Sequence, residues 1–208
     1  MRLFLFLFRH GSTEGNTIKR YIGATDEPLC DFGIKEIEDE RKALLDNTIE
    51  SADKRAFIEL NQSMRKIYVS PKTRTKQTAK ILFPKSPLEE IADFREMSFG
   101  LFEGKNAAEM STGEIGELYQ QWVDSNCLSK CPDSAQFKGE SKDSFSLRVC
   151  NALIELCQRE KLKNGDVIPI VCHGGTIKAL LERFAVKRMG YFDWQTNHGA
   201  YRFEEIEI

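Results

Sequence analysis

Short apolar runs alternate with longer segments of helical periodicity along this chain. The run 3–8 is unbroken and closes in a polar, glycine-containing segment, a pattern typical of a strand buried on both faces. Residues 66–70 and 167–172 are two further strand-like runs, although Pro169 in the second indicates a bulge or a position without a ladder partner. Helices are predicted over 33–46, 74–82, 114–123 and 144–161. A last helix is predicted to follow residues 173–176 and to run through Phe184.

The remaining segments are less regular. Residues 51–66 are charged and weakly periodic, so they are interpreted as a helix tail and surface connection. Residues 91–104 mix acidic and aromatic side chains with two glycines, which favours a structured loop. Residues 124–143 are predicted to form a long loop, and 201–208, which partly alternate, a last strand.

Strands that alternate with helices over 208 residues predict a single α/β domain spanning 1–208. We expect a three-layer sandwich, with a mostly parallel central sheet and helices on both faces. Apolar residues make up 41% and charged residues 30%, as in ordinary globular proteins. The net charge of −2 gives no support for nucleic-acid binding through bulk electrostatics.

No membrane span or secretion signal is expected. The apolar run 3–8 is too short for a signal peptide, is flanked by Arg2 and Arg9, and lacks a small-residue cleavage site. The six cysteines show no C-x-x-C pair and no zinc spacing, which favours reduced, mostly buried thiols in a cytoplasmic protein. Cys150 and Cys157 should share a helix face, and Cys127 with Cys131 is the one pair that could be redox-active.

Three strand-to-helix junctions carry chemistry: Arg9-His10-Gly11, Arg74 and His173-Gly174-Gly175. Ligands of open α/β sheets bind at the carboxyl ends of strands. Arginine presents a planar fork of donors to phosphate or carboxylate, and histidine is a nucleophile or base near neutral pH. Glycine in these positions would let the backbone approach a ligand closely. The junctions therefore predict a shared anion site with titrating nitrogens in it.

Other interpretations of single residues stay open at this point. Arg74 alone could equally be an ordinary helix-start arginine, and Arg9 could pair with Glu14 at the surface. His198, in Asn197-His198-Gly199, is expected to belong to a turn. The segment Lys19-Arg20-Tyr21 either rims the pocket or is solvated.

Five motifs in chain order resemble the histidine phosphatase superfamily, the phosphoglycerate-mutase-like group. They cover residues 9 to 175, nearly the whole chain. The motifs are Arg-His-Gly-x-Thr from Arg9, Ser-Pro-x-x-Arg-x-x-Gln-Thr-Ala from Ser70, Glu-x-x-Phe-Gly-x-Phe-Glu-Gly from Glu96, Gly-Glu-Ser from Gly139 and His-Gly-Gly from His173.

The resemblance implies a role for each matching residue. His10 would attack phosphorus through a neutral ring whose other nitrogen donates to a backbone carbonyl. Glu96 would protonate the leaving oxygen and then accept a proton from water. His173 would act with the arginines on the phosphoryl oxygens. The expected substrate-binding residues are Arg9, Thr13, Asn16, Gly23, Arg74 and Gly174. The expected chemistry needs no metal and no cofactor.

Departures from the family favour a phosphatase. Ser12 stands where the family often has Glu or Gln, and Gly15 stands where the mutases usually carry Trp. The segment between the Glu96 motif and His173 is also shorter than is usual in the mutases. The expected activity is hydrolysis of a small phosphomonoester, and Gly139-Glu140-Ser141 with Arg148-Val149 resembles the α-ribazole phosphatase branch. A phosphoglycerate mutase and a non-catalytic phospho-ligand binding module are the alternatives, and the sequence does not indicate an oligomeric state.

Overall fold

Five strands form one sheet in the described residues, 1–46 and 51–208, of the computed structural model. Their order is β3-β2-β4-β1-β5. The first four run parallel to their neighbours, and β5 pairs antiparallel with β1. This confirms the predicted mostly parallel sheet. The strands are β1 (Arg2–Arg9), β2 (Ile67–Val69), β3 (Leu88–Glu90), β4 (Val167–Cys172) and β5 (Tyr201–Glu207).

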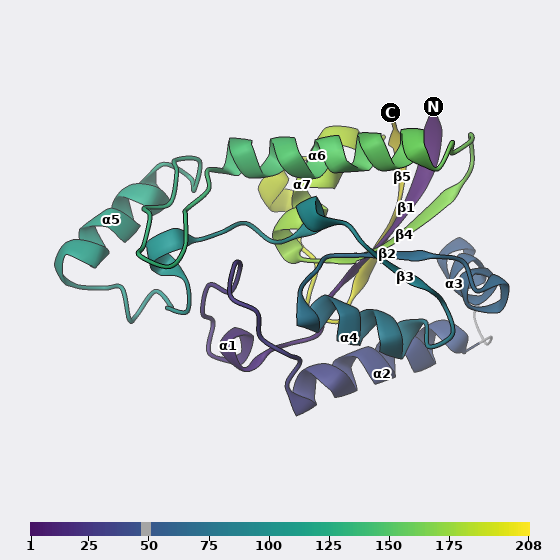
Figure 1. Cartoon of the computed structure of the whole chain (residues 1–208), viewed down its shortest axis with the longest axis horizontal. Helices are drawn as coiled ribbons and strands as arrows, with labels where there is room; N and C mark the ends of the chain where they lie inside the picture. The colour runs from purple at the N-terminus through teal and green to yellow at the C-terminus, as the bar shows by residue number, and fades with distance from the viewer. Residues whose placement is uncertain (47–50) are drawn as a thin grey trace.

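Helices cover both faces of the sheet, as predicted (Figure 1). One face carries α6 (Lys142–Arg159) and α7 (Gly174–Phe184), and the other carries α2 (Asp31–Leu45), α3 (Ala52–Ser63) and α4 (Thr73–Leu82). The unbroken apolar run of β1 follows from this arrangement, because successive side chains of a strand point to opposite faces. Leu3, Leu5 and Leu7 belong to the core beneath α6 and α7, and Phe6 and Phe8 belong to the core on the other face.

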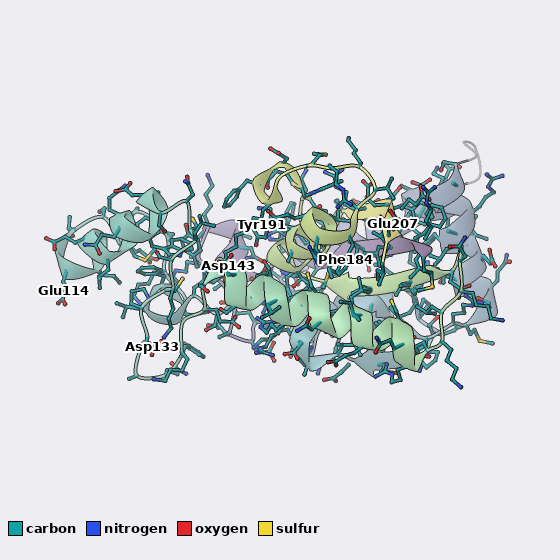
Figure 2. All side chains as sticks on the ribbon, turned by 90° about the horizontal axis from the view of Figure 1, so that it is seen from above. Glu114, Asp133, Asp143, Phe184, Tyr191 and Glu207 are labelled. Atoms are coloured by element: carbon teal, nitrogen blue, oxygen red, sulfur yellow. The ribbon has the colours of Figure 1, made fainter. Side chains whose placement is uncertain are left out.

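A lobe built around α5 (Gly113–Asp124) lies beyond the sheet (Figure 1). Figure 2 shows Glu114 of α5 and Asp133 of the following loop at one end of the molecule, away from Glu207 of β5. The shorter elements are α1 (Glu14–Thr17) and the 3₁₀ turns η1 (Ala92–Phe94), η2 (Gly100–Phe102) and η3 (Tyr191–Asp193). The segments predicted as loops, 91–104 and 124–143, contain only η1, η2, the last residue of α5 and the first two residues of α6.

A helix takes the place of one predicted connection. Residues 51–66 contain a helix of 12 residues, α3, in place of a helix tail and connection. Its buried Phe57 and Leu60 pack into the core beside β1, and this tertiary contact outweighs its weak periodicity. Of the two alternatives for Pro169, the position without a ladder partner is the one present. β4 pairs with β1 in continuous register through Pro169, so there is no bulge, and its pairing with β2 begins only at Ile170.

The cysteines agree with the expectation of reduced thiols. All six are free, five are buried, and Cys127 is partly exposed. Cys150 and Cys157 are both buried on α6, as predicted from their spacing. None of the helices in the described ranges has the length and apolarity that crossing a bilayer requires.

Candidate active site

The carboxyl ends of three neighbouring strands meet at one edge of the sheet. Arg9 of β1 is level with Cys172 of β4, and Val171 of β4 is level with Val69 of β2. The residues that follow these strands are therefore neighbours. The rings of His10 and His173 lie 5.1 Å apart, centroid to centroid. The predicted convergence of the strand-to-helix junctions is thus present in the structure.

His10 is held as a neutral ring with a free lone pair. Its Nδ1 lies 2.7 Å from the carbonyl oxygen of Gly11. Because a carbonyl only accepts, Nδ1 carries the proton and Nε2 is unprotonated. Burial lowers the pKa of His10 well below 6.5, and the charges of Arg74 and Arg9 add to that effect. This geometry matches the ring orientation expected for a nucleophilic nitrogen.

Arg74 is a fully buried cation at the start of α4. Its Nη1 donates to the carbonyl of Thr25 at 2.9 Å, and its Nη2 donates to those of Ile22 and Gly23 at 3.3 Å. Gly23 thus orients Arg74, and its expected contact with substrate stays a prediction. A Cβ at Gly23 would lie 1.8 Å from the carbonyl oxygen of Met97, so packing alone requires glycine there.

Glu103 fixes the loop that supplies these carbonyls. Its buried carboxylate accepts from the backbone nitrogens of Gly23, Ala24 and Thr25 at 2.7 to 3.2 Å, and from that of Phe99 at 3.0 Å. Glu103 therefore connects the Glu96 motif to the support of Arg74. Glu103 belongs to the motif that begins at Glu96, but no role for it was predicted from the sequence.

Three buried nitrogens of the site lack a hydrogen-bond partner among the described residues. They are Nε of Arg9, Nε of Arg74 and Nδ1 of His173. His173 is fully buried, and its Nε2 lies 2.7 Å from the hydroxyl of Ser70. An unsatisfied buried donor or acceptor costs about 1–3 kcal/mol, and two of these three nitrogens are arginine donors, which fits a site that binds an anion.

Arg9 is held by the segment that precedes β5. Its Nη1 donates to the carbonyl of Thr196 at 2.7 Å, and its Nη2 lies 2.6 Å from Nε2 of His198. The surface pairing of Arg9 with Glu14 is therefore absent. His198 does lie in a turn, as expected, but its ring is also 5.5 Å from that of His10. It therefore lies in the site, for which only His10 and His173 were predicted among the histidines.

Thr13 and Asn16 bond to one another at the start of α1. The hydroxyl of Thr13 accepts from the backbone nitrogen of Asn16 at 3.3 Å, and the amide oxygen of Asn16 accepts from that of Thr13 at 3.2 Å. This capping box orients both residues, and their contact with substrate remains a prediction. An added Cβ at Gly11 would lie 2.4 Å from the carbonyl oxygen of Gly33 in α2. Helix packing alone therefore requires this glycine, and the close approach of a ligand to its backbone stays a prediction.

Glu96 lies against the first turn of α7. Its carboxylate accepts from the backbone nitrogen of Gly175 and from that of Met97, both at 2.9 Å. A Cβ at Gly175 would lie 2.2 Å from this carboxylate, and one at Gly174 would lie 3.1 Å from Cζ of Arg9. The two glycines therefore let Arg9 and Glu96 pack closely against the helix start. The expected donation from the Gly174 backbone to substrate stays a prediction.

The Gly-Glu-Ser motif supports the Glu96 loop. Glu140 and Arg148 form a two-pronged ion pair at 2.7 and 2.8 Å. Arg148 also donates to the carbonyls of Asp93, Arg95 and Glu96 at 2.8 to 3.0 Å. Both members of the pair are only slightly exposed, so the bonds are shielded from water.

A cavity of about 220 Å³ opens beside Glu96 and Gly175, between α7 and the α5 lobe. Tyr21 lines it, whereas Lys19 is exposed and Arg20 pairs with Glu109, so only the tyrosine of that segment rims the pocket. No cluster of three or more histidine, cysteine or acidic side chains in the described ranges could hold a metal ion. The other cavity-lining residues are Met97, Phe99, Trp122, Cys127, Lys142, Lys178, Tyr191 and Phe192.

Comparison with known proteins identifies the family. The model of the histidine phosphatase superfamily (branch 1) matches residues 5–204, and the chain belongs to that family. A probable phosphoglycerate mutase GpmB from Photorhabdus laumondii is 28% identical over 181 residues, which are 86% of this chain and 73% of the relative.

Solved structures share the fold. The alpha-ribazole phosphatase of Shigella flexneri has a TM-score of 0.71 at 24% identity, covering 98% of this chain and 89% of the other. A phosphoserine phosphatase of Entamoeba histolytica, solved with 3-phosphoglyceric acid, has a TM-score of 0.63 at 23% identity, covering 97% and 89%. At these identities the likeness establishes the fold and leaves the substrate open.

Proposed function

We propose that this chain is a metal-independent phosphatase that hydrolyses a small phosphomonoester through a phosphohistidine at His10. The observation that carries the proposal is the bond from His10 Nδ1 to the Gly11 carbonyl, which leaves Nε2 as a neutral nucleophile at the edge of the sheet. The matched family supports it, since histidine phosphatases act on small phosphorylated substrates.

In the first step, Nε2 of His10 attacks phosphorus while the bond to the leaving oxygen breaks. Arg9, Arg74 and His173 bind the three phosphoryl oxygens and stabilise their charge during transfer. If the hydroxyl of Ser70 donates to Nε2 of His173, the proton of that ring lies on Nδ1, the nitrogen without a partner. Two arginines supply the positive charge that a metal ion would provide in other phosphoryl-transfer sites.

Glu96 acts as the general acid and then as the general base. It donates one to the leaving oxygen, then removes one from the water that attacks the phosphohistidine, and inorganic phosphate leaves. Its position in the lining of the cavity supports this role, because the leaving group must lie on the side of phosphorus opposite His10 and the cavity offers room for it. The Glu140–Arg148 pair keeps the Glu96 backbone in place.

A phosphoglycerate mutase is the second candidate, favoured by the 28% identity to the GpmB relatives. It would return the phosphoryl group to the substrate in place of water. The environment of Gly15 supports the phosphatase, because a Cβ there would lie 2.7 to 2.8 Å from side chains of Ile22 and Glu27. The tryptophan usual in mutases cannot fit beside that backbone without rearrangement. A non-catalytic binding module is the third candidate, and it would need no Glu96.

The α-ribazole phosphatase among the structural neighbours makes α-ribazole 5′-phosphate a specific substrate to test. The six free thiols support a reducing, cytoplasmic location.

The test is phosphate release from a panel of phosphomonoesters in the presence of a chelator. The panel contains α-ribazole 5′-phosphate and 3-phosphoglycerate, the latter also with bisphosphoglycerate. Wild type should release phosphate, and His10→Ala should not, with folding of both verified by circular dichroism. Isomerisation of 3-phosphoglycerate without phosphate release would establish the mutase. Equal phosphate release by wild type and His10→Ala would exclude both enzymes.

A further inference from the structure

The cavity beside Glu96 has aromatic walls. The rings of Tyr21, Phe99 and Trp122 form one wall, with centroids 5.1 to 6.3 Å apart, and Tyr191 and Phe192 contribute from η3. Tyr191 is labelled in Figure 2, on the side of the helical layer that faces α5. An apolar cavity of about 150 Å³ holds benzene, so a cavity of about 220 Å³ has room for a substituted ring.

Lys178 adds a positively charged side chain to the lining of the cavity. It lies three residues after Gly175 on α7, and residues at this spacing share a helix face, so Lys178 and the Glu96 contact belong to the same face. Its Nζ lies 5.8 Å from the ring centroids of Tyr191 and Phe192. The side chain is partly buried, and burial lowers the pKa of Lys178, while the charge of Glu96 opposes that effect.

Lys142, the second lysine of the cavity, already forms an ion pair. Nζ of Lys142 lies 3.0 Å from the carboxylate of Glu182 and 4.7 Å from the ring of Tyr191. In contrast, no described carboxylate lies within ion-pair distance of Lys178. The charge of Glu96 acts on Lys178 without a direct ion pair, so a partly buried ammonium remains that an approaching anion can pair with.

We propose that this cavity binds the leaving group of the substrate, and that Lys178 binds a second anionic group on a flat leaving group. This inference rests on the proposed function, because the cavity is placed at the leaving-group side by the role of Glu96. The substrate class is therefore a phosphomonoester whose leaving group combines a ring with a carboxylate or a second phosphate. Such a group would stack on the aromatic wall and pair with Lys178.

The test compares kcat/KM for phenyl phosphate, 4-carboxyphenyl phosphate and the bisphosphate of hydroquinone. Lys178→Met should lower kcat/KM for the two anionic substrates about tenfold, corresponding to ~1.4 kcal/mol. It should leave phenyl phosphate within about twofold, and Lys178→Arg should restore most of the loss. The exposed Lys187, which follows α7, supplies the matched control Lys187→Met, which should leave all three substrates unchanged. The ratio between carboxylate and phosphate substrates identifies the preferred anion.

Three results would overturn the inference: an equal loss on phenyl and 4-carboxyphenyl phosphate, no loss on either anionic substrate, or a wild-type preference for phenyl phosphate. Calorimetric binding of 4-hydroxybenzoate separates this inference from the proposed function. If no protein releases phosphate but wild type binds 4-hydroxybenzoate and Lys178→Met does not, the phosphatase is wrong and the cavity assignment holds. If phosphate is released but Lys178→Met binds 4-hydroxybenzoate as tightly as wild type does, the phosphatase proposal stands and the role of Lys178 in the cavity is wrong.

Discussion

Nη2 of Arg9 lies 2.6 Å from Nε2 of His198, so an imidazole holds one of the cations of the proposed anion site. Since arginine only donates, Nε2 of His198 accepts and its proton is on Nδ1. Burial, with Arg9 and Arg74 nearby, lowers the pKa of His198 to about 3, so the ring stays neutral and able to accept. His198 is therefore a positioning residue for Arg9.

Removal of this acceptor should weaken catalysis. We expect His198→Ala to lower kcat/KM for phosphate release about 10- to 100-fold, because a hydrogen bond to a charged group contributes ~1.5–3 kcal/mol. His198→Gln retains an acceptor and should recover most of the loss. Steady-state kinetics of both variants, with urea unfolding in parallel, separates positioning from stability. Wild-type kinetics in His198→Ala would show that the contact has no role in the reaction.

The buried histidines make stability depend on pH. Burial lowers the pKa of His10 and His173 well below 6.5, as it does for His198. As pH falls below 6.5, the unfolded chain binds protons that the folded chain does not. The free energy of unfolding should therefore fall with pH, by up to about 1.4 kcal/mol per pH unit for each histidine. Above about pH 7.5 these groups contribute no slope.

Urea unfolding between about pH 7.5 and about pH 5.5, where most carboxylates stay ionised, measures this slope. His198→Asn should make it shallower by about one third, since one of three histidines is removed. An unfolding free energy that is constant over this range would mean that the histidines are not buried as described.

Glu96→Gln tests the acid. Poor leaving groups depend on protonation, so alkyl phosphates should lose about 10²–10⁴-fold in kcat, the usual contribution of general acid catalysis. The hydrolysis of 4-nitrophenyl phosphate, whose leaving group needs no proton, should be slowed far less in its first step. Single-turnover kinetics with both substrate types gives the rate of that step directly. An equal loss on alkyl and nitrophenyl esters would show that another group is the acid.

Glu103→Gln should damage both stability and activity. The carboxylate accepts four backbone hydrogen bonds, and an amide cannot accept all of them. We expect the free energy of unfolding to fall by about 1–3 kcal/mol, and kcat/KM to fall because the carbonyls that hold Arg74 lose their support. The exposed Glu117 on α5 offers the control Glu117→Gln, which should change neither quantity. Unaltered activity in a destabilised Glu103→Gln would separate this loop from Arg74.

The apolar runs predicted most of the sheet because a central strand buried on both faces has a strong, simple pattern. The junction residues could also be predicted, since the carboxyl ends of parallel strands share an edge. Short or weakly patterned elements could not be predicted in this way. Strand β3 has three residues, two of them glutamates, and α3 contributes few buried apolar side chains. Their formation depends on contacts with distant segments, which local patterns do not record.

The position of His198 follows from strand direction. An antiparallel edge strand begins where the parallel strands end, so the segment before β5 reaches the same edge. His198 precedes a strand instead of following one, so the rule that ligands bind where strands end did not predict its place in the site. The cavity could not be predicted from the sequence either, because Tyr21, Trp122 and Tyr191, which line it, come from three distant parts of the chain.

Covalent labelling of His10 is the most direct test of the central claim. Wild type mixed with a hydrolysable phosphomonoester, quenched in alkali and digested, should yield the His10 peptide carrying one phosphoryl group, as seen by mass spectrometry. The label should disappear in His10→Ala and accumulate in Glu96→Gln with an activated ester, since attack by water is slowed. Phosphate release by wild type without any label on His10, or a label on another residue, would contradict the account.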